Sequence, residues 1–178
     1  MRKLAIALCL TASVLTALGQ GSINFNNRVT AVGINAPVDF AGANVTGPEY
    51  VGQLFVNNAG SFEAVGAPVE FRTGAAAGYI NGGSVSVSFV APGASADVIM
   101  RAWATASGAD WDAASTNPNG IFGESNQISI ATGGAGSPPS LPADLVGLNA
   151  FTLTQVPEPS TVALGLLGLA ALALRRRK

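Results

Sequence analysis

Histidine is absent from this chain of 178 residues, and the one cysteine, Cys9, lies close to the amino terminus. Residues 20–156 therefore contain neither residue type. Their absence excludes disulfides, zinc sites of the Cys/His type, Cys–His nucleophile pairs and the Ser-His-Asp triad from this segment. We expect no metal or other cofactor there, and a segment whose fold is held together by packing alone.

Charge is also scarce, and lysine is missing from residues 20–156. Three arginines (Arg28, Arg72 and Arg101) stand against nine acidic residues, which gives this segment a net charge of −6. The whole chain carries only −1, because both of its ends are basic. An acidic segment without lysine offers no surface for a phosphate backbone, so we expect no nucleic-acid partner.

Long apolar runs are missing except at the two ends of the chain. At the amino terminus, two basic residues precede an apolar run over residues 4–18. Ala17 and Gly19 place small side chains at the two positions that signal peptidase inspects. Residues 1–19 are therefore predicted to be a secretory signal peptide, cleaved by signal peptidase before Gln20. The alternative is an uncleaved membrane anchor.

At the carboxyl terminus, residues 161–174 carry no charge, and four consecutive basic residues follow them: Arg175, Arg176, Arg177 and Lys178. Fourteen helical residues rise about 21 Å, against a hydrocarbon core of roughly 30 Å, so the run alone is marginal as a transmembrane helix. Snorkelling of the basic side chains lengthens it at one end, and they stay cytoplasmic. We expect the preceding domain to lie outside the cytoplasm, tethered to the inner membrane.

A Pro-Glu-Pro motif leads into this apolar run, in the order Val156, Pro157, Glu158, Pro159, Ser160. The prolines favour an extended backbone at the residues before them, a form that proteases and transpeptidases commonly bind. The motif, the apolar run and the basic end together resemble the PEP-CTERM sorting signal of Gram-negative bacteria, over residues 156–178 only. The resemblance implies recognition by exosortase, a membrane enzyme that cuts near the motif, and delivery to the cell surface or an exopolysaccharide matrix.

Between the two ends, short alternating apolar runs bounded by turn residues predict β-strands. In residues 84–90, Val85, Val87 and Phe89 share one face, which is typical of a half-buried strand. In residues 97–104 both faces carry bulky side chains, so we expect a central strand with Arg101 and Trp103 near a rim or groove. Further strands are predicted at residues 22–26, 29–34, 38–40, 50–56, 62–65, 69–72, 127–131 and 150–155.

Turn residues recur about every dozen positions between these strands, as in all-β sandwiches. We therefore predict that residues 20–155 form a single β-sandwich, jelly-roll or immunoglobulin-like, flanked by the signal peptide and the transmembrane helix. Residues 107–123 are polar and are expected to form a surface loop with one helical turn at 112–115. Residues 132–142 are expected to form a second loop, and residues 144–148 a short turn.

The polar loop holds the best group of candidate ligands for a metal ion. Its acidic and amide side chains could bind calcium, but Ala114 stands where the EF-hand pattern needs an oxygen ligand. The simpler interpretation is that these residues form turns. The group comprises Asp110, Asp112, Asn117, Asn119 and Glu124, beside Trp103 and Trp111.

Aromatic and acidic residues suggest two further functions. Trp103, Trp111, Tyr50 and Tyr79 could stack on sugars, although large aromatics more often fill cores. Trp111 is the better candidate, with Trp103 beside it, because it lies in a polar loop. A glycosidase needs two facing carboxylates, and nothing singles out a pair. We expect no enzymatic activity, and a cell-surface or matrix role that rests on the resemblance. The alternatives are a carbohydrate-binding module and, with less support, a glycan hydrolase.

Overall fold

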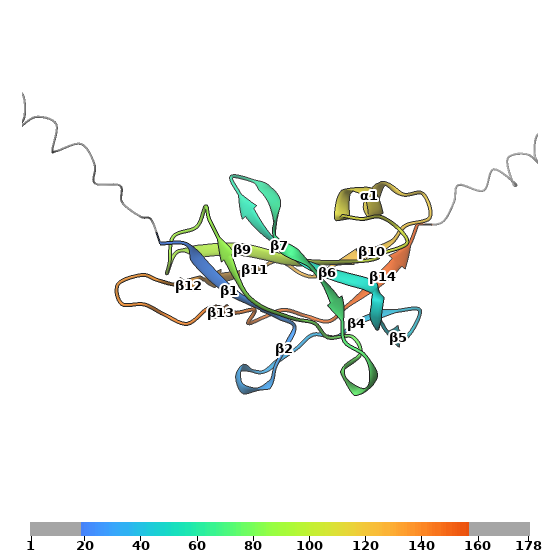
Figure 1. Cartoon of the computed structure of the whole chain (residues 1–178), viewed down its shortest axis with the longest axis horizontal. Helices are drawn as coiled ribbons and strands as arrows, with labels where there is room; N and C mark the ends of the chain where they lie inside the picture. The colour runs from blue at the N-terminus through green and yellow to red at the C-terminus, as the bar shows by residue number, and fades with distance from the viewer. Residues whose placement is uncertain (1–18, 157–178) are drawn as a thin grey trace, which may run out of the picture.

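The computed structural model describes residues 19–156, which form mostly β-strands, as the sequence predicts (Figure 1). Residues 1–18 and 157–178 lie outside the described part. The apolar run of the predicted signal peptide, the predicted transmembrane helix and most of the sorting motif fall there. Among residues 19–156, no helix has the length and apolar character needed to cross a membrane.

The larger of the two main sheets has the strand order β5-β4-β14-β10-β9-β6-β7, and β11 pairs with β9. Neighbours are antiparallel except β4 and β14, which run parallel. The strands are β4 (Val38–Phe40), β5 (Ala43–Asn44), β6 (Gly47–Asn58), β7 (Ser61–Phe71), β9 (Ser95–Ala104), β10 (Ile121–Glu124), β11 (Ile128–Ala131) and β14 (Phe151–Gln155).

The smaller sheet is built around β1 (Gly21–Asn26), which pairs with β8 (Asn81–Val87), β12 (Gly133–Gly134) and β13 (Ala143–Asp144). The β1–β13 pairing is parallel, and the other two are antiparallel. Shorter elements complete the described chain: a ribbon of β2 (Arg28–Val29) and β3 (Ile34–Asn35), the 3-10 helices η1 (Thr30–Val32) and η2 (Gly74–Ala76), and the helix α1 (Trp111–Thr116).

One apolar core takes side chains from both sheets. Ile23 and Phe25 of β1 belong to the same buried cluster as Leu54 of β6, Met100 of β9 and Leu153 of β14. All five are almost completely buried. Burial of this apolar surface is the dominant stabilising force for a fold without disulfides. The assignment to a jelly-roll or immunoglobulin-like sandwich remains a prediction.

Strand β9 is central, as its two bulky faces predict. It pairs with β6 along one edge and with β10 and β11 along the other. Its face toward the main core carries Val98 and Met100, and its other face carries Arg101 and Trp103. This second face lies under α1, so it is covered in part by the helix (Figure 1).

Several predicted boundaries are wrong for local reasons. Residues 29–34 are not one strand, because η1 interrupts them and Gly33 (φ 79°) turns the chain into β3. Residues 62–65 and 69–71 belong to one strand, β7, which continues through a register shift opposite Gly52 and Leu54, and Arg72 lies just past its end. Phe89 follows the end of β8 and is exposed, so only Val85 and Val87 keep the predicted alternation.

Candidate functional site

Helix α1 begins where the sequence predicts a helical turn, and local polar contacts define both of its ends. Asp110 is the N-cap, with its Oδ1 accepting from the backbone N of Ala113 at 2.8 Å. Past the other end, Asn117 donates from Nδ2 to the Ser107 carbonyl at 2.8 Å, and its Oδ1 accepts from the Asn119 backbone N. The residues weighed as calcium ligands therefore shape this loop.

Glu124 lies apart from the rest of that group. It belongs to β10, where its Oε2 accepts from Nε of Arg101 at 3.1 Å. The described chain contains no group of three acidic side chains placed to hold a metal ion. The residues considered as calcium ligands therefore lie in two places. Most of them are at or beside α1, and Glu124 forms an ion pair between β10 and β9.

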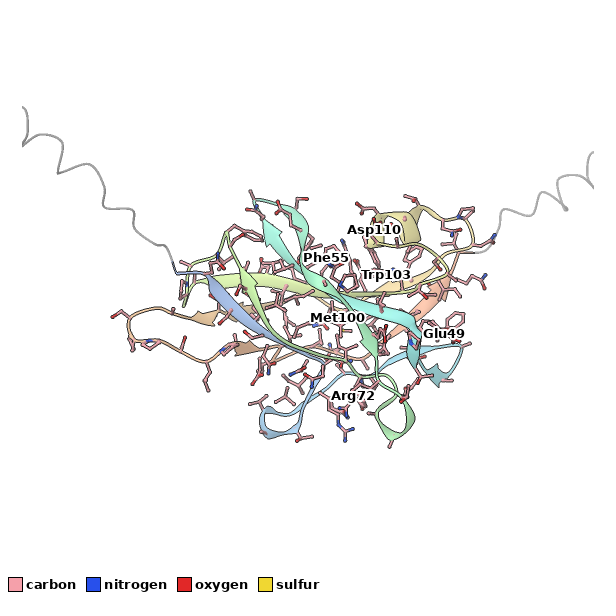
Figure 2. The ribbon with its side chains drawn as sticks, in the orientation of Figure 1. Glu49, Phe55, Arg72, Met100, Trp103 and Asp110 are labelled. Atoms are coloured by element: carbon pink, nitrogen blue, oxygen red, sulfur yellow. The ribbon has the colours of Figure 1, made fainter. Side chains whose placement is uncertain are left out.

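An aromatic cluster lies between α1 and the outer face of the sheet. Trp111 packs edge-on against Phe55, Trp103 and Phe122, with ring centroids 6.3, 6.3 and 5.5 Å away. Such T-shaped pairs match the positive ring edge to the negative ring face. Phe55, Trp103 and Asp110 lie on the α1 side of β9 (Figure 2). The cluster fixes α1 to the sheet.

Trp103 and Trp111 have different roles in this cluster. Trp103 is 0% exposed and donates from Nε1 to the Gly108 carbonyl at 3.1 Å, so it supports the loop from below. A glycan cannot touch it in this structure, and its prediction as a glycan contact is corrected for that reason. Trp111 is partly exposed and remains a candidate for contact with a glycan.

Arg101 is held against the same cluster by two rings and one carboxylate. Its Cζ lies 4.6 Å from the ring centroids of both Phe55 and Trp111. Its ion pair with Glu124 neutralises the guanidinium, and the side chain is 18% exposed. Cation–π contacts of this kind are stronger where water is partly excluded. Arg101 is therefore a structural part of the aromatic cluster, in contact with Phe55 and Trp111.

A hollow of about 160 Å³ opens beside Trp111. Among its lining residues, Gln53 is only 7% exposed and donates from Nε2 to the Gly66 carbonyl at 2.6 Å. Within residues 19–156, Arg101–Glu124 is the one ion pair. The lining consists of Gln53, Phe55, Ala64, Asp110, Trp111 and Asp112.

The hollow combines apolar walls with oxygen atoms suited to accepting hydrogen bonds. Its two carboxylates, Asp110 and Asp112, come from the first turn of one short helix. A glycosidase needs carboxylates that face each other across the scissile bond, which this common origin does not provide. Sequence reasoning missed Gln53 because a strand glutamine carries no motif.

The first and last described residues, next to the predicted processing sites, lie at opposite ends of the domain (Figure 1). Strand β1 begins at Gly21, directly after the predicted cleavage site between Gly19 and Gln20. At the other end, the backbone N of Val156 donates to the Gly120 carbonyl at 3.0 Å, just past β14. Ala17, the motif residues 157–160 and the basic residues 175–178 lie outside the described part.

Comparison with known proteins identifies the carboxyl-terminal tail of the chain. No significant match is found among curated proteins or among solved structures. A protein-family model does match, over residues 155–178. This segment starts at the last residue of β14 and includes the Pro-Glu-Pro motif, the apolar run and the basic end. The carboxyl-terminal tail of this chain is a PEP-CTERM protein-sorting motif.

Proposed function

We propose that this is a non-catalytic exported protein that an exosortase sorts to the cell surface or into an exopolysaccharide matrix. The observation that carries the proposal is the match of residues 155–178 to the PEP-CTERM protein-sorting motif. In this proposal, signal peptidase removes residues 1–19, and the carboxyl-terminal helix holds the chain in the inner membrane until it is cut. The delivered domain is a β-sandwich of residues 20–155.

The position of the motif relative to the fold supports this order of events. β14 ends at Gln155, and the backbone N of Val156, the last described residue, still donates to the Gly120 carbonyl. In the sequence, only the Pro-Glu-Pro segment and Ser160 then separate the domain from the apolar run. An enzyme that cuts near the motif would release a domain whose strands are all intact.

The test is a Glu158→Ala substitution in the producing organism, followed by immunoblotting of membrane and extracellular fractions. We expect the unprocessed precursor to accumulate in the membrane, as it should also do for the unchanged chain in a strain lacking exosortase. Glu70→Ala is the matched control, because Glu70 is an exposed carboxylate on β7 and should leave processing unchanged. Normal release of the Glu158 variant would contradict the proposal.

A carbohydrate-binding module is the second candidate, and one observation favours it. The hollow beside Trp111 places a partly exposed indole next to three side chains that carry acceptor oxygens: Gln53, Asp110 and Asp112. Binding sites for small ligands have this composition of apolar walls and a few placed polar groups. Loss of binding to the producer's own exopolysaccharide in Trp111→Ala would support the candidate, and an unaltered affinity would count against it.

A further inference from the structure

We propose that Gln20 cyclises to pyroglutamate once signal peptidase has exposed it, so that the delivered domain carries no primary amine. This inference rests on the proposed function, because it needs the removal of residues 1–19 and of the tail. Two features of the chain carry it. A glutamine follows the predicted cleavage site, and the two lysines, Lys3 and Lys178, lie one in each segment that is removed.

The reaction is an amide exchange within one residue. The uncharged α-nitrogen of Gln20 attacks Cδ, the new bond closes a five-membered lactam, and the bond from Cδ to Nε2 breaks. Nε2 leaves as ammonia with the proton that the α-nitrogen loses, so no co-reactant is needed. The pKa of an α-amino group is about 7.7–8.0, so on the order of a tenth of it is uncharged at pH 7. Holding both groups in one residue supplies the high effective concentration.

The structure leaves the Gln20 side chain available for this reaction. It is exposed, and within residues 19–156 it makes no hydrogen bond. The backbone that follows is fixed, because the N of Gly21 donates to the Val90 carbonyl at 2.7 Å. The carbonyl of Gln20 lies against Gly134, where an added Cβ would be 2.5 Å from its oxygen. The side chain is therefore free to fold back onto its own amine while β1 stays in place.

Ring closure leaves the fold intact. Strand β1 begins at Gly21, which lies opposite Val87 and Gly134, and its Ile23 is 0% exposed in the core. The lactam forms one residue before these contacts, at the exposed Gln20. It removes the positive charge of the amino terminus, as other terminal modifications do. Because aminopeptidases bind a free α-amine, the cyclised residue also protects the start of β1 from them.

The absence of lysine gives this modification a consequence for the whole domain. Primary amines form Schiff bases with carbonyl compounds, and the reducing ends of polysaccharides are such compounds. Residues 20–156 contain no lysine, so the α-amine of Gln20 is the one primary amine of the delivered segment. Its cyclisation makes the domain inert toward the reducing ends of the sugars in the proposed matrix.

The experiment labels amines on the mature protein as the organism releases it. The freshly harvested extracellular fraction is treated with an isotopically marked acetylating reagent before trypsin digestion, because an acetylated amine cannot cyclise during handling. Mass spectrometry then reads the peptide from Gln20 to Arg28. We expect this peptide to be unlabelled in most molecules and lighter than the uncyclised peptide by one ammonia. A labelled Gln20 in most molecules would overturn the proposal.

Gln20→Asn is the matched variant. Asparagine keeps an amide, but its cyclisation would need a strained four-membered ring, so the α-amine should stay free. The variant should fold normally, since the Gln20 side chain is exposed and makes no hydrogen bond within residues 19–156. We expect its amino terminus to be labelled in most molecules. An unlabelled terminus in the variant as well would show that the block is not cyclisation, and the proposal would fail.

The position of the label separates this proposal from those on which it rests. Label on Met1 or Lys3 in the released protein would show an uncleaved signal peptide and would overturn both the predicted cleavage and the cyclisation. Label on Lys178 with a blocked Gln20 would contradict removal of the tail, and with it the amine-free domain, while the cyclisation would stand. Label on Gln20 alone would defeat the cyclisation and leave the sorting proposal intact.

Discussion

At the scale of single residues, Asn27 contributes the most specific polar contacts in the core. Its side chain is 0% exposed. Its Nδ2 donates to the carbonyls of Ala36 at 2.8 Å and Gly78 at 2.9 Å, and its Oδ1 accepts from the backbone N of Ile80 at 2.8 Å. One amide thus satisfies backbone groups of two segments that are far apart in the sequence. Buried backbone groups of this kind are costly to leave unpaired.

We therefore expect Asn27→Ala to lower the free energy of unfolding by about 3–5 kcal/mol, from three lost hydrogen bonds and a cavity. Urea unfolding of residues 19–156, which contain both sheets and their shared core, measures the loss. Asn44→Ala is the control, because its one side-chain bond, from Nδ2 to the Ala77 carbonyl at 3.2 Å, is exposed. The control should cost under about 1 kcal/mol, and equal losses would contradict this account.

Residue composition excludes His- and Cys-based sites from residues 20–156, but it could not distinguish one tryptophan from another. Trp103 and Trp111 are eight positions apart, and both were candidates for glycan contact. Trp103 is buried because its strand is covered by α1, a contact set by packing between distant segments. Gln53 was not a candidate, because its position beside the hollow depends on the pairing of β6 with β9. The pairing of β6 with β9 joins segments that are far apart in the sequence, so it cannot be predicted from the residues around Gln53.

At the scale of elements, α1 is a helix of six residues that depends on its cap and on the cluster beneath it. Helices this short are not stable alone. We expect Asp110→Ala to destabilise residues 19–156 by about 1 kcal/mol, because the Ala113 N–H loses its acceptor. Urea unfolding followed by tryptophan fluorescence reports it directly, since Trp111 opens the helix and Trp103 lies below it.

Asp110→Asn is the matched substitution for this cap. Because asparagine accepts the same hydrogen bond, the variant should unfold within a few tenths of a kcal/mol of the unchanged protein. If the asparagine variant loses as much as the alanine variant, the carboxylate charge is the stabilising feature and the cap is not.

Strands with strong alternation were predictable, and those defined by their partners were not. The sequence pattern of β9 predicted a central strand, and the structure pairs it on both edges. β10 was assigned to a loop, because Ile121–Glu124 is short and contains Gly123. That glycine allows a close approach, since a Cβ there would lie 2.8 Å from the Thr152 carbonyl. The pairing of β10 with β14 therefore requires a residue that weakens the local signal for a strand.

At the scale of the whole molecule, the last strand completes the fold directly before the sorting motif. β14 lies inside the larger sheet, antiparallel to β10 and parallel to β4. Its Leu153 is 2% exposed in the core shared by both sheets. Loss of β14 would leave two unpaired strand edges and a cavity in the core. The domain therefore depends on residues only a few positions from the exosortase motif.

We predict that a chain ending at residue 156 is exported as a folded, protease-resistant domain and that a chain ending at residue 150 is not. The two differ by β14 and Val156. Thermolysin digestion of extracytoplasmic fractions, followed by immunoblotting, measures resistance. Rapid digestion of the shorter chain is expected, because both neighbours of β14 lose their hydrogen-bond partners. Equal resistance of the two chains would mean that β14 is dispensable, and cutting could then fall before the motif without loss of the fold.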